Sequence, residues 1–222
     1  TKEMQRRRFM AVTSSIGPGA TNLVTAAALA HVNRLPILLL PGDVFADRRP
    51  DPVLQQIEDF EDGTVSANDC FRPVSRYFDR ITRPEQLLNA LPKAMSILTD
   101  PAMTGPVTLA FCQDVQAEAY NYPVSFFEPS YWNVRRIQPD RREIERLAST
   151  LEKSKKPVLI AGGGVKYSNA QDELKEFLDI TKVPLVVTQA GKSVLVEKDE
   201  QNLGSIGAVS YTHLRAHETS RN

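Results

Sequence analysis

The chain has 222 residues, its 27 lysines and arginines balance its 27 aspartates and glutamates, and 41% of its residues are hydrophobic. This length suits one large domain or two small ones. The lack of a basic excess argues against nucleic acid or an anionic membrane as a partner, and no apolar stretch is long enough to span a membrane. Cys70 and Cys112 lack metal-ligand spacing, so we expect buried thiols in a cytoplasmic protein.

The first part of the chain alternates apolar runs of strand length with helical patterns. The run at 36–40, bounded by Pro36 and Pro41, is typical of a strand buried on both faces of a parallel sheet. Such alternation predicts β-α-β crossovers and an α/β fold with a parallel sheet. We predict strands at 9–12, 36–40, 73–78 and 106–111, and helices at 20–30, 51–60 and 83–98.

A proline- and aromatic-rich stretch at 120–139 interrupts this pattern. We interpret it as an interdomain linker, with an aromatic-lined ligand groove as the alternative. A second α/β unit follows, with predicted helices at 140–151 and 170–180 and predicted strands at 157–161 and 184–188. Ile144, Leu147 and Leu151 are expected to face inward. The predicted boundaries are 1–128 for the first domain, 129–140 for the linker and 141–208 for the start of the second domain.

The segment TSSIGPGATN at 13–22 stands between a predicted strand and a predicted helix. Small residues there let a ligand approach the backbone, and the helix N-terminus directs amide hydrogens outward. A strand, a glycine-rich turn and a helix form a ligand-binding edge in open α/β sheets. The alternative is that Gly17 and Gly19 only make a tight connection.

Two further glycine motifs give weaker signals. Gly162, Gly163 and Gly164 follow a predicted strand but lack the spacing of the dinucleotide fingerprint. Gly191-Lys192-Ser193 resembles the end of a phosphate-binding loop, but Val186 occupies the position of the motif's first glycine. We therefore do not expect nucleotide hydrolysis.

Acidic residues concentrate between positions 43 and 62, where a solvated surface is favoured over an acid–base or metal site. His31 is expected to sit near a helix end rather than act in catalysis. The tail at 209–222 contains VSYTHLRAHET, which resembles the translation of a sequencing-library transposon end joined to an adapter. We expect this tail to be non-native, and we give His213 and His217 no metal-binding role.

The runs SIGPGATN and PILLLPGDVF resemble the pyrimidine-binding domain of thiamine diphosphate enzymes of the acetohydroxyacid synthase type. KKPVLIAGGGVKYSNA and VPLVVTQAGKS resemble the first half of their Rossmann-like central domain. RPDPVLQQ, residues 72–87 and TQAGKS are similar to one branch of that family. That branch hydrolyses a ring carbon–carbon bond of a cyclic polyhydroxy dione in inositol catabolism, giving an open-chain deoxy sugar acid.

The resemblance implies thiamine diphosphate with Mg²⁺ as cofactors and a homodimer or homotetramer. It assigns Gly17, Pro18, Gly19 and Asn22 to the cofactor and places Gln55 on the substrate side. It puts the catalytic glutamate upstream of Thr1 and the Mg²⁺ ligands in a later domain. We therefore expect a truncated chain that is inactive alone. FAD contact by the central-domain glycines stays open. The alternatives are an acetohydroxyacid synthase-like enzyme or decarboxylase, or a non-catalytic module of the same fold.

Overall fold

The computed structural model describes residues 8–47, 49, 53–56, 59, 61–134, 137–195 and 199–207. The chain divides into two compact units, one spanning Arg7–Val134 and the other containing Arg135–Asn222. The division falls inside the segment 129–140, while the predicted domain limits themselves stay predictions. The predicted non-native tail lies outside the described residues.

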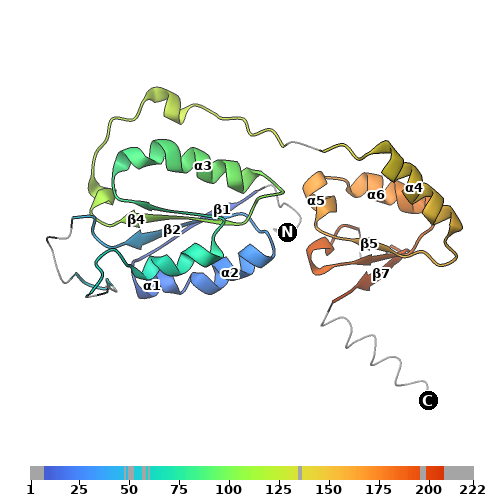
Figure 1. Ribbon diagram of the computed structural model, residues 1–222, viewed down its shortest axis with the longest axis horizontal. Coiled ribbons are helices and arrows are strands. Elements are labelled where there is room, and N and C mark those ends of the chain that lie inside the picture. The colour runs from blue at the N-terminus through green and yellow to red at the C-terminus, as the bar shows by residue number, and fades with distance from the viewer. Residues whose placement is uncertain are drawn as a thin grey trace, which may run out of the picture. The chain divides into compact units, whose positions relative to one another are not determined.

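The first unit is built on a four-stranded parallel sheet with the strand order β1-β2-β4-β3. Helix α3 covers one face of this sheet, and helices α1 and α2 lie on the other (Figure 1). The elements, with η for 3-10 helices, are β1 (Met10–Ser14), α1 (Pro18–Thr21), α2 (Val24–Val32), β2 (Ile37–Asp43), η1 (Ala67–Val74), β3 (Tyr77–Ile81), η2 (Pro84–Gln86), α3 (Leu87–Thr99), β4 (Pro106–Cys112), η3 (Val115–Ala117) and η4 (Val124–Phe127).

Alternation along the central strands produces a core on each face of this sheet. Successive side chains of a strand point to opposite faces, so Leu38 joins the cluster under α3, while Leu39 joins the cluster under α1 and α2. Alanines on the helices permit close packing. Ala90 and Ala94 of α3 are almost fully buried, as is Ala27 of α2.

Several predicted boundaries in this unit were wrong. The helix predicted at 20–30 is two helices, because the chain turns after α1 and resumes helical structure at Val24. Strand β2 continues through Pro41 to Asp43. The strand predicted at 73–78 starts only at Tyr77. Residues 67–74 form η1, which a capping box starts: the side chain of Ser66 accepts from a backbone N–H of η1, and Asp69 accepts from the N–H of Ser66.

The helix predicted at 51–60 is absent from its described central part. Residues 53–56 form a turn in which Gln55 has a φ of 65°. The other residues of that segment are described only at Asp59, which is not helical. The regular spacing of apolar residues was therefore a poor guide here, because a positive φ is incompatible with a continuing α-helix.

The second unit holds a three-stranded parallel sheet with the order β5-β6-β7. Its core gathers Leu178 of α6 with Leu185 and Val187 of β6. The predicted α/β class with parallel sheets is confirmed in both units. The elements are α4 (Arg141–Lys153), β5 (Leu159–Ala161), α5 (Gly164–Ser168), α6 (Gln171–Thr181), β6 (Leu185–Val187), η5 (Gln189–Gly191) and β7 (Asn202–Ser205).

Helix α4 lies within two residues of its predicted bounds but does not have the predicted burial. Ile144 and Leu147, expected to face inward, are 50% and 64% exposed. Cys112 is buried as expected, whereas Cys70 is exposed, and neither forms a disulfide with a described residue. No helix within the described ranges is long and apolar enough to cross a membrane.

Candidate functional site

The strands β1, β2 and β4 end at the same edge of the parallel sheet, where open α/β folds bind ligands. Segments after these strands enclose a cavity of about 250 Å³. The turn that carries Gln55 forms another part of its wall. The lining residues are Ser14, Ser15, Ile16, Gly42, Phe45, Val53, Leu54, Gln55, Gln113 and Gln116.

Glycines shape the wall that follows β1. Gly17 has φ 64° and ψ −120°, a conformation open essentially only to glycine. A Cβ on Gly19 would lie 2.5 Å from the hydroxyl oxygen of Ser15, and one on Gly42 would lie 3.3 Å from the backbone nitrogen of Ile16. The loop after β1 therefore packs closely against both α1 and the end of β2, which places Ser14 to Ile16 at the cavity.

The predicted cofactor residues follow the lining residues Ser14 to Ile16 in the sequence, but they do not line the cavity themselves. Pro18 opens α1, and the backbone N–H of Asn22 donates to the carbonyl oxygen of Pro18 at 3.3 Å. The two side chains are exposed and one helical turn apart, so they share a face. Gln55 does line the cavity, which brings the predicted substrate-side residue to the loop SIGPG.

Asp114 joins two of the loops around the cavity, and sequence reasoning missed it. One carboxylate oxygen accepts from the backbone N–H groups of Ala46 at 2.9 Å and Val115 at 3.0 Å. The other accepts from the N–H of Asp47 at 2.8 Å. This carboxylate holds the segment that carries Phe45 against the segment that carries the two cavity glutamines.

Gln113 and Gln116 also line the cavity, and neither was predicted from the sequence. Gln113 follows β4 directly and Gln116 lies in η3 just beyond it, so the rule that ligands bind beyond the carboxyl ends of parallel strands could have found them. The backbone N–H of Gln113 donates to the carbonyl oxygen of Asp43 at 3.2 Å, which ties the end of β4 to the end of β2. The side chain of Gln116 donates to the carbonyl oxygen of Phe111 at 3.2 Å.

A buried ion pair lies next to the cavity wall at the end of β2. Asp43 is fully buried, which corrects the expectation that the acidic segment is a solvated surface at this position. Its carboxylate accepts from Arg80 at 2.7 Å. The same guanidinium donates to the hydroxyl of Ser66 at 2.8 Å and to Asp69 at 3.1 Å. Arg80 therefore joins β2, β3 and η1.

The hydrogen bonds and charges of this network change the pKa of Asp69. Burial opposes its ionisation, but the N–H of Ser66 and the guanidinium groups of Arg72 and Arg80 outweigh burial and lower the pKa of Asp69. Elsewhere in the acidic segment, Asp59, Glu61 and Asp62 are exposed as expected. Asp51 and Glu58 lie outside the described residues.

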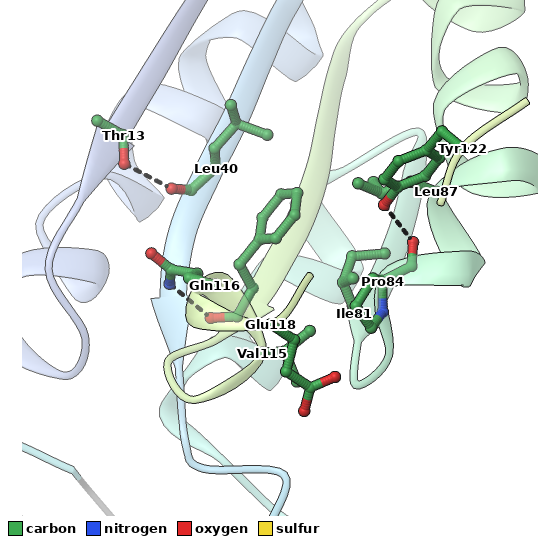
Figure 2. Close-up of a pocket in the computed structure, with 10 residues that line it drawn as sticks. Thr13, Leu40, Ile81, Pro84, Leu87, Val115, Gln116, Glu118 and Tyr122 are labelled. Atoms are coloured by element: carbon green, nitrogen blue, oxygen red, sulfur yellow. Dashed lines mark hydrogen bonds between the residues drawn. The ribbon is translucent and has the colours of Figure 1, made fainter. Parts of the chain in front are cut away.

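A second cavity of about 360 Å³ lies between the sheet and the segment after β4 (Figure 2). Its walls are mainly apolar, with Leu40, Ile81 and Leu87 among them. Two of its polar side chains donate hydrogen bonds to backbone carbonyl oxygens. Thr13 donates to the carbonyl oxygen of Leu40 at 2.9 Å, and the hydroxyl of Tyr122 donates to that of Pro84 at 2.7 Å (Figure 2).

Other motifs have structural roles in the described parts of the chain. The ring nitrogen Nδ1 of His31 lies 3.0 Å from the carbonyl oxygen of Val74, at the end of α2 as expected. A Cβ on Gly191 would lie 2.1 Å from the carbonyl oxygen of Ala161, so this glycine is needed for packing. The described residues contain no group of three or more His, Cys, Asp or Glu side chains that could hold a metal ion.

Residues 144–219 match the sequence profile of the family described as thiamine pyrophosphate enzyme, central domain. The chain is also 49% identical over 207 residues to the 3D-(3,5/4)-trihydroxycyclohexane-1,2-dione hydrolase of Bacillus subtilis (strain 168). It is 50% identical over 206 residues to a hydrolase of the same name, numbered 2, from Bacillus cereus. Each alignment covers 93% of this chain. Over residues 144–219 the chain is therefore similar to the central domains of thiamine pyrophosphate enzymes.

The chain spans 32% of the length of these two curated relatives. The profile match includes α5, α6 and the strands β5 to β7. It runs to residue 219 and overlaps the predicted non-native tail. The origin of that tail stays a prediction.

Proposed function

We propose that this chain supplies the pyrimidine-binding domain and the start of the central domain of a thiamine diphosphate-dependent hydrolase. The proposed reaction opens trihydroxycyclohexane-1,2-dione to 5-deoxyglucuronate in myo-inositol degradation. Identity of about half the residues to proteins named for hydrolysis of this dione is the observation that carries the proposal. The position of Gln55 at one cavity with Ser15 and Ile16 of the loop SIGPG supports it.

The residues around α1 fit the uncharged pyrimidine end of the cofactor. Asn22 presents an exposed amide that both donates and accepts hydrogen bonds, and Pro18 presents an apolar ring on the same face. Gly17 and Gly19 permit the tight turn that puts these side chains at the edge of the sheet. When bound, thiamine diphosphate supplies a nucleophilic thiazolium carbon and an electron sink for breaking a carbon–carbon bond beside a carbonyl.

The described residues do not fit the Mg²⁺ that the cofactor's diphosphate would carry. Magnesium sites in proteins use carboxylates together with phosphate oxygens and water, and no cluster of three candidate ligands occurs within the described ranges. We propose that its ligands belong to a part of the enzyme outside this chain. A cytoplasmic homodimer or homotetramer is likewise proposed from the family resemblance.

A chimera tests the function directly. Residues of this chain would replace the matching 207-residue segment of the Bacillus subtilis relative, and consumption of the dione would be followed with and without thiamine diphosphate. We expect turnover that requires the cofactor. Consumption of pyruvate but not of the dione would instead support the acetohydroxyacid synthase-like alternative, and cofactor-independent behaviour would contradict both.

Within this chimera, Asn22→Leu tests the cofactor assignment. Loss of one or two amide hydrogen bonds should raise the thiamine diphosphate concentration needed for half-maximal activity roughly 5- to 20-fold. Asn89→Leu, a matched change on the exposed side of α3, should leave it unchanged. An equal effect of the two substitutions would argue against a specific role for Asn22. The unmodified 222-residue chain alone is expected to show no turnover.

A further inference from the structure

The described residues that line the cavity beyond β1, β2 and β4 are all uncharged. Its polar groups are hydroxyls and amides, from Ser14, Ser15, Gln55, Gln113 and Gln116, and the remaining walls are apolar or glycine. None of these lining residues carries a charge at neutral pH. A primary amide offers two donors and an acceptor, which matches a hydroxyl that donates and accepts in turn.

Among the described residues, four charged side chains close in sequence to the cavity walls already have partners. Asp43, which follows the lining residue Gly42, is held by Arg80 at 2.7 Å. Arg49 is ion-paired with Asp47, and Asp114 accepts three backbone N–H groups. Among these described neighbours, each cation already has an anionic partner. A carboxylate ligand there would find no cation among the described lining residues to pair with, and an anion without a partner is disfavoured to the extent that it is removed from water.

Several polar side chains at this cavity have no hydrogen-bond partner among the described residues. The hydroxyl of Ser14 is buried and has no hydrogen-bond partner among the described residues. The side chains of Gln55 and Gln113 are exposed and make no hydrogen bond within the described ranges. The larger cavity differs, because its Thr13 and Tyr122 donate to backbone carbonyls. The smaller cavity is therefore the better site for a ligand rich in hydroxyls.

Gln113 is the best-placed specificity residue of this set. Its backbone is anchored to Asp43, and the next residue, Asp114, fixes the facing loop. Its amide consequently projects from a rigid junction between two strand ends. Gln55 faces the same cavity from a turn with a positive φ.

We propose that Gln113, together with Gln55, selects an uncharged polyhydroxylated ring over a carboxylate ligand in this cavity. The inference rests on the proposed function, since it assigns the specificity of the proposed substrate side to named residues. It adds Gln113, which the family resemblance did not point to, and it accounts for why a 2-keto acid would be the poorer ligand.

The test uses the full 222-residue chain labelled with nitrogen-15. It is titrated with myo-inositol, an uncharged ring of hydroxyls, and separately with pyruvate, while the side-chain amide resonances are followed by NMR. Myo-inositol should shift the amides of Gln113 and Gln55 in a saturable manner, with millimolar affinity. Pyruvate should leave them in place.

Two variants of Gln113 sharpen the test. Gln113→Leu should weaken myo-inositol binding roughly fivefold or more, because at least one hydrogen bond is lost. Gln113→Arg supplies the missing cation and should create saturable pyruvate binding. The matched changes at the exposed linker residue, Gln138→Leu and Gln138→Arg, should have neither effect. Unchanged backbone resonances elsewhere verify that each variant is folded.

The inference fails if pyruvate shifts the wild-type amides as strongly as myo-inositol, if Gln113→Leu leaves the affinity unaltered, or if neither compound binds. Such a failure is distinct from failure of the proposed function, which the chimera decides by dione turnover. If the chimera turns over the dione but Gln113→Leu does not change the affinity for myo-inositol, the proposed function stands and the specificity role of Gln113 is rejected.

Discussion

Gly17 occupies the point where strand β1 gives way to helix α1. Its φ of 64° and ψ of −120° lie in a region that side chains with a Cβ strongly avoid. Its carbonyl oxygen also accepts from the N–H of Thr21 at 2.9 Å, so the residue starts the helix. The glycine is therefore required by the backbone, whether or not a ligand touches it.

Gly17→Ala should lower the free energy of unfolding by about 1–3 kcal/mol, because alanine would be held in a strained conformation. Urea denaturation followed by circular dichroism measures this loss. Gly164→Ala serves as the control, since an added Cβ there meets nothing within 4 Å and alanine favours a helix. Equal stability of the two variants would show that the turn can relax.

At the scale of elements, the end of β2 is joined to β3 and η1 by the Asp43–Arg80 ion pair. The Asp43 carboxylate is 1% exposed and the Arg80 side chain 19% exposed. Removing one partner of a buried pair leaves the other charge buried without compensation, which costs more than the pair contributes. The ion pair thus matters for the junction on which the cavity wall at Gly42 depends.

Arg80→Met should lower the free energy of unfolding by about 3–5 kcal/mol, with Asp43 left unpaired. Arg49→Met is the matched control, because Arg49 is paired with Asp47 and its side chain is 88% exposed. Surface pairs of this kind contribute about 0–1 kcal/mol. Chemical denaturation of both variants separates the two cases, and similar losses would contradict the buried-pair argument.

Asp69 gives the same network a dependence on pH. Because its pKa is lowered in the folded chain, its contribution to stability is complete above the unfolded value of about 3.9 and is lost as the pH falls through the folded value. Asp69→Asn should therefore flatten the decline of stability below about pH 4. Thermal melts across the acid range would show this, with the exposed Glu128→Gln as control. If Asp69→Asn left the dependence of the melting temperature on acid pH unchanged, Asp69 would not be the source of this pH dependence.

Elements with strong local signals were predictable from the sequence. The continuous apolar run of β4 and the amphipathic pattern of α6 appear close to their predicted positions. The shift of β3 has a local cause, since the capping box at Ser66 and Asp69 favours a 3-10 helix over an extended chain through Val74. The burial of Asp43 could not be predicted, because its partner Arg80 is 37 residues away.

The candidate site was predictable only in part. The loop SIGPG and Gln55 carried a recognisable family pattern. Gln55 lines one cavity with Ser15 and Ile16 of that loop, whereas the predicted cofactor residues do not line it. Asp114, Gln113 and Gln116 have no motif of their own. Their roles follow from where β4 ends relative to β1 and β2, which is a property of strand order and register rather than of local sequence.

At the scale of the whole molecule, the two units have separate hydrophobic cores of unequal extent. The first contains clusters on both faces of its sheet. The second contains one cluster around Leu178, while Ile160 of β5 and Leu203 of β7 remain 60% and 63% exposed. Stability is therefore expected to be higher in the first unit, because burial of apolar surface is the main favourable contribution.

Leu39→Ala and Leu178→Ala test whether each core supports its own unit. Both side chains are fully buried, so each substitution should cost about 2–5 kcal/mol. Hydrogen exchange followed by mass spectrometry should show protection lost within residues 8–134 for Leu39→Ala and within residues 137–207 for Leu178→Ala. Leu54→Ala, at an 85% exposed side chain, should change neither pattern. Loss of protection throughout the chain from either core substitution would mean that the two units unfold as one, because a shared transition couples every amide to the weaker core.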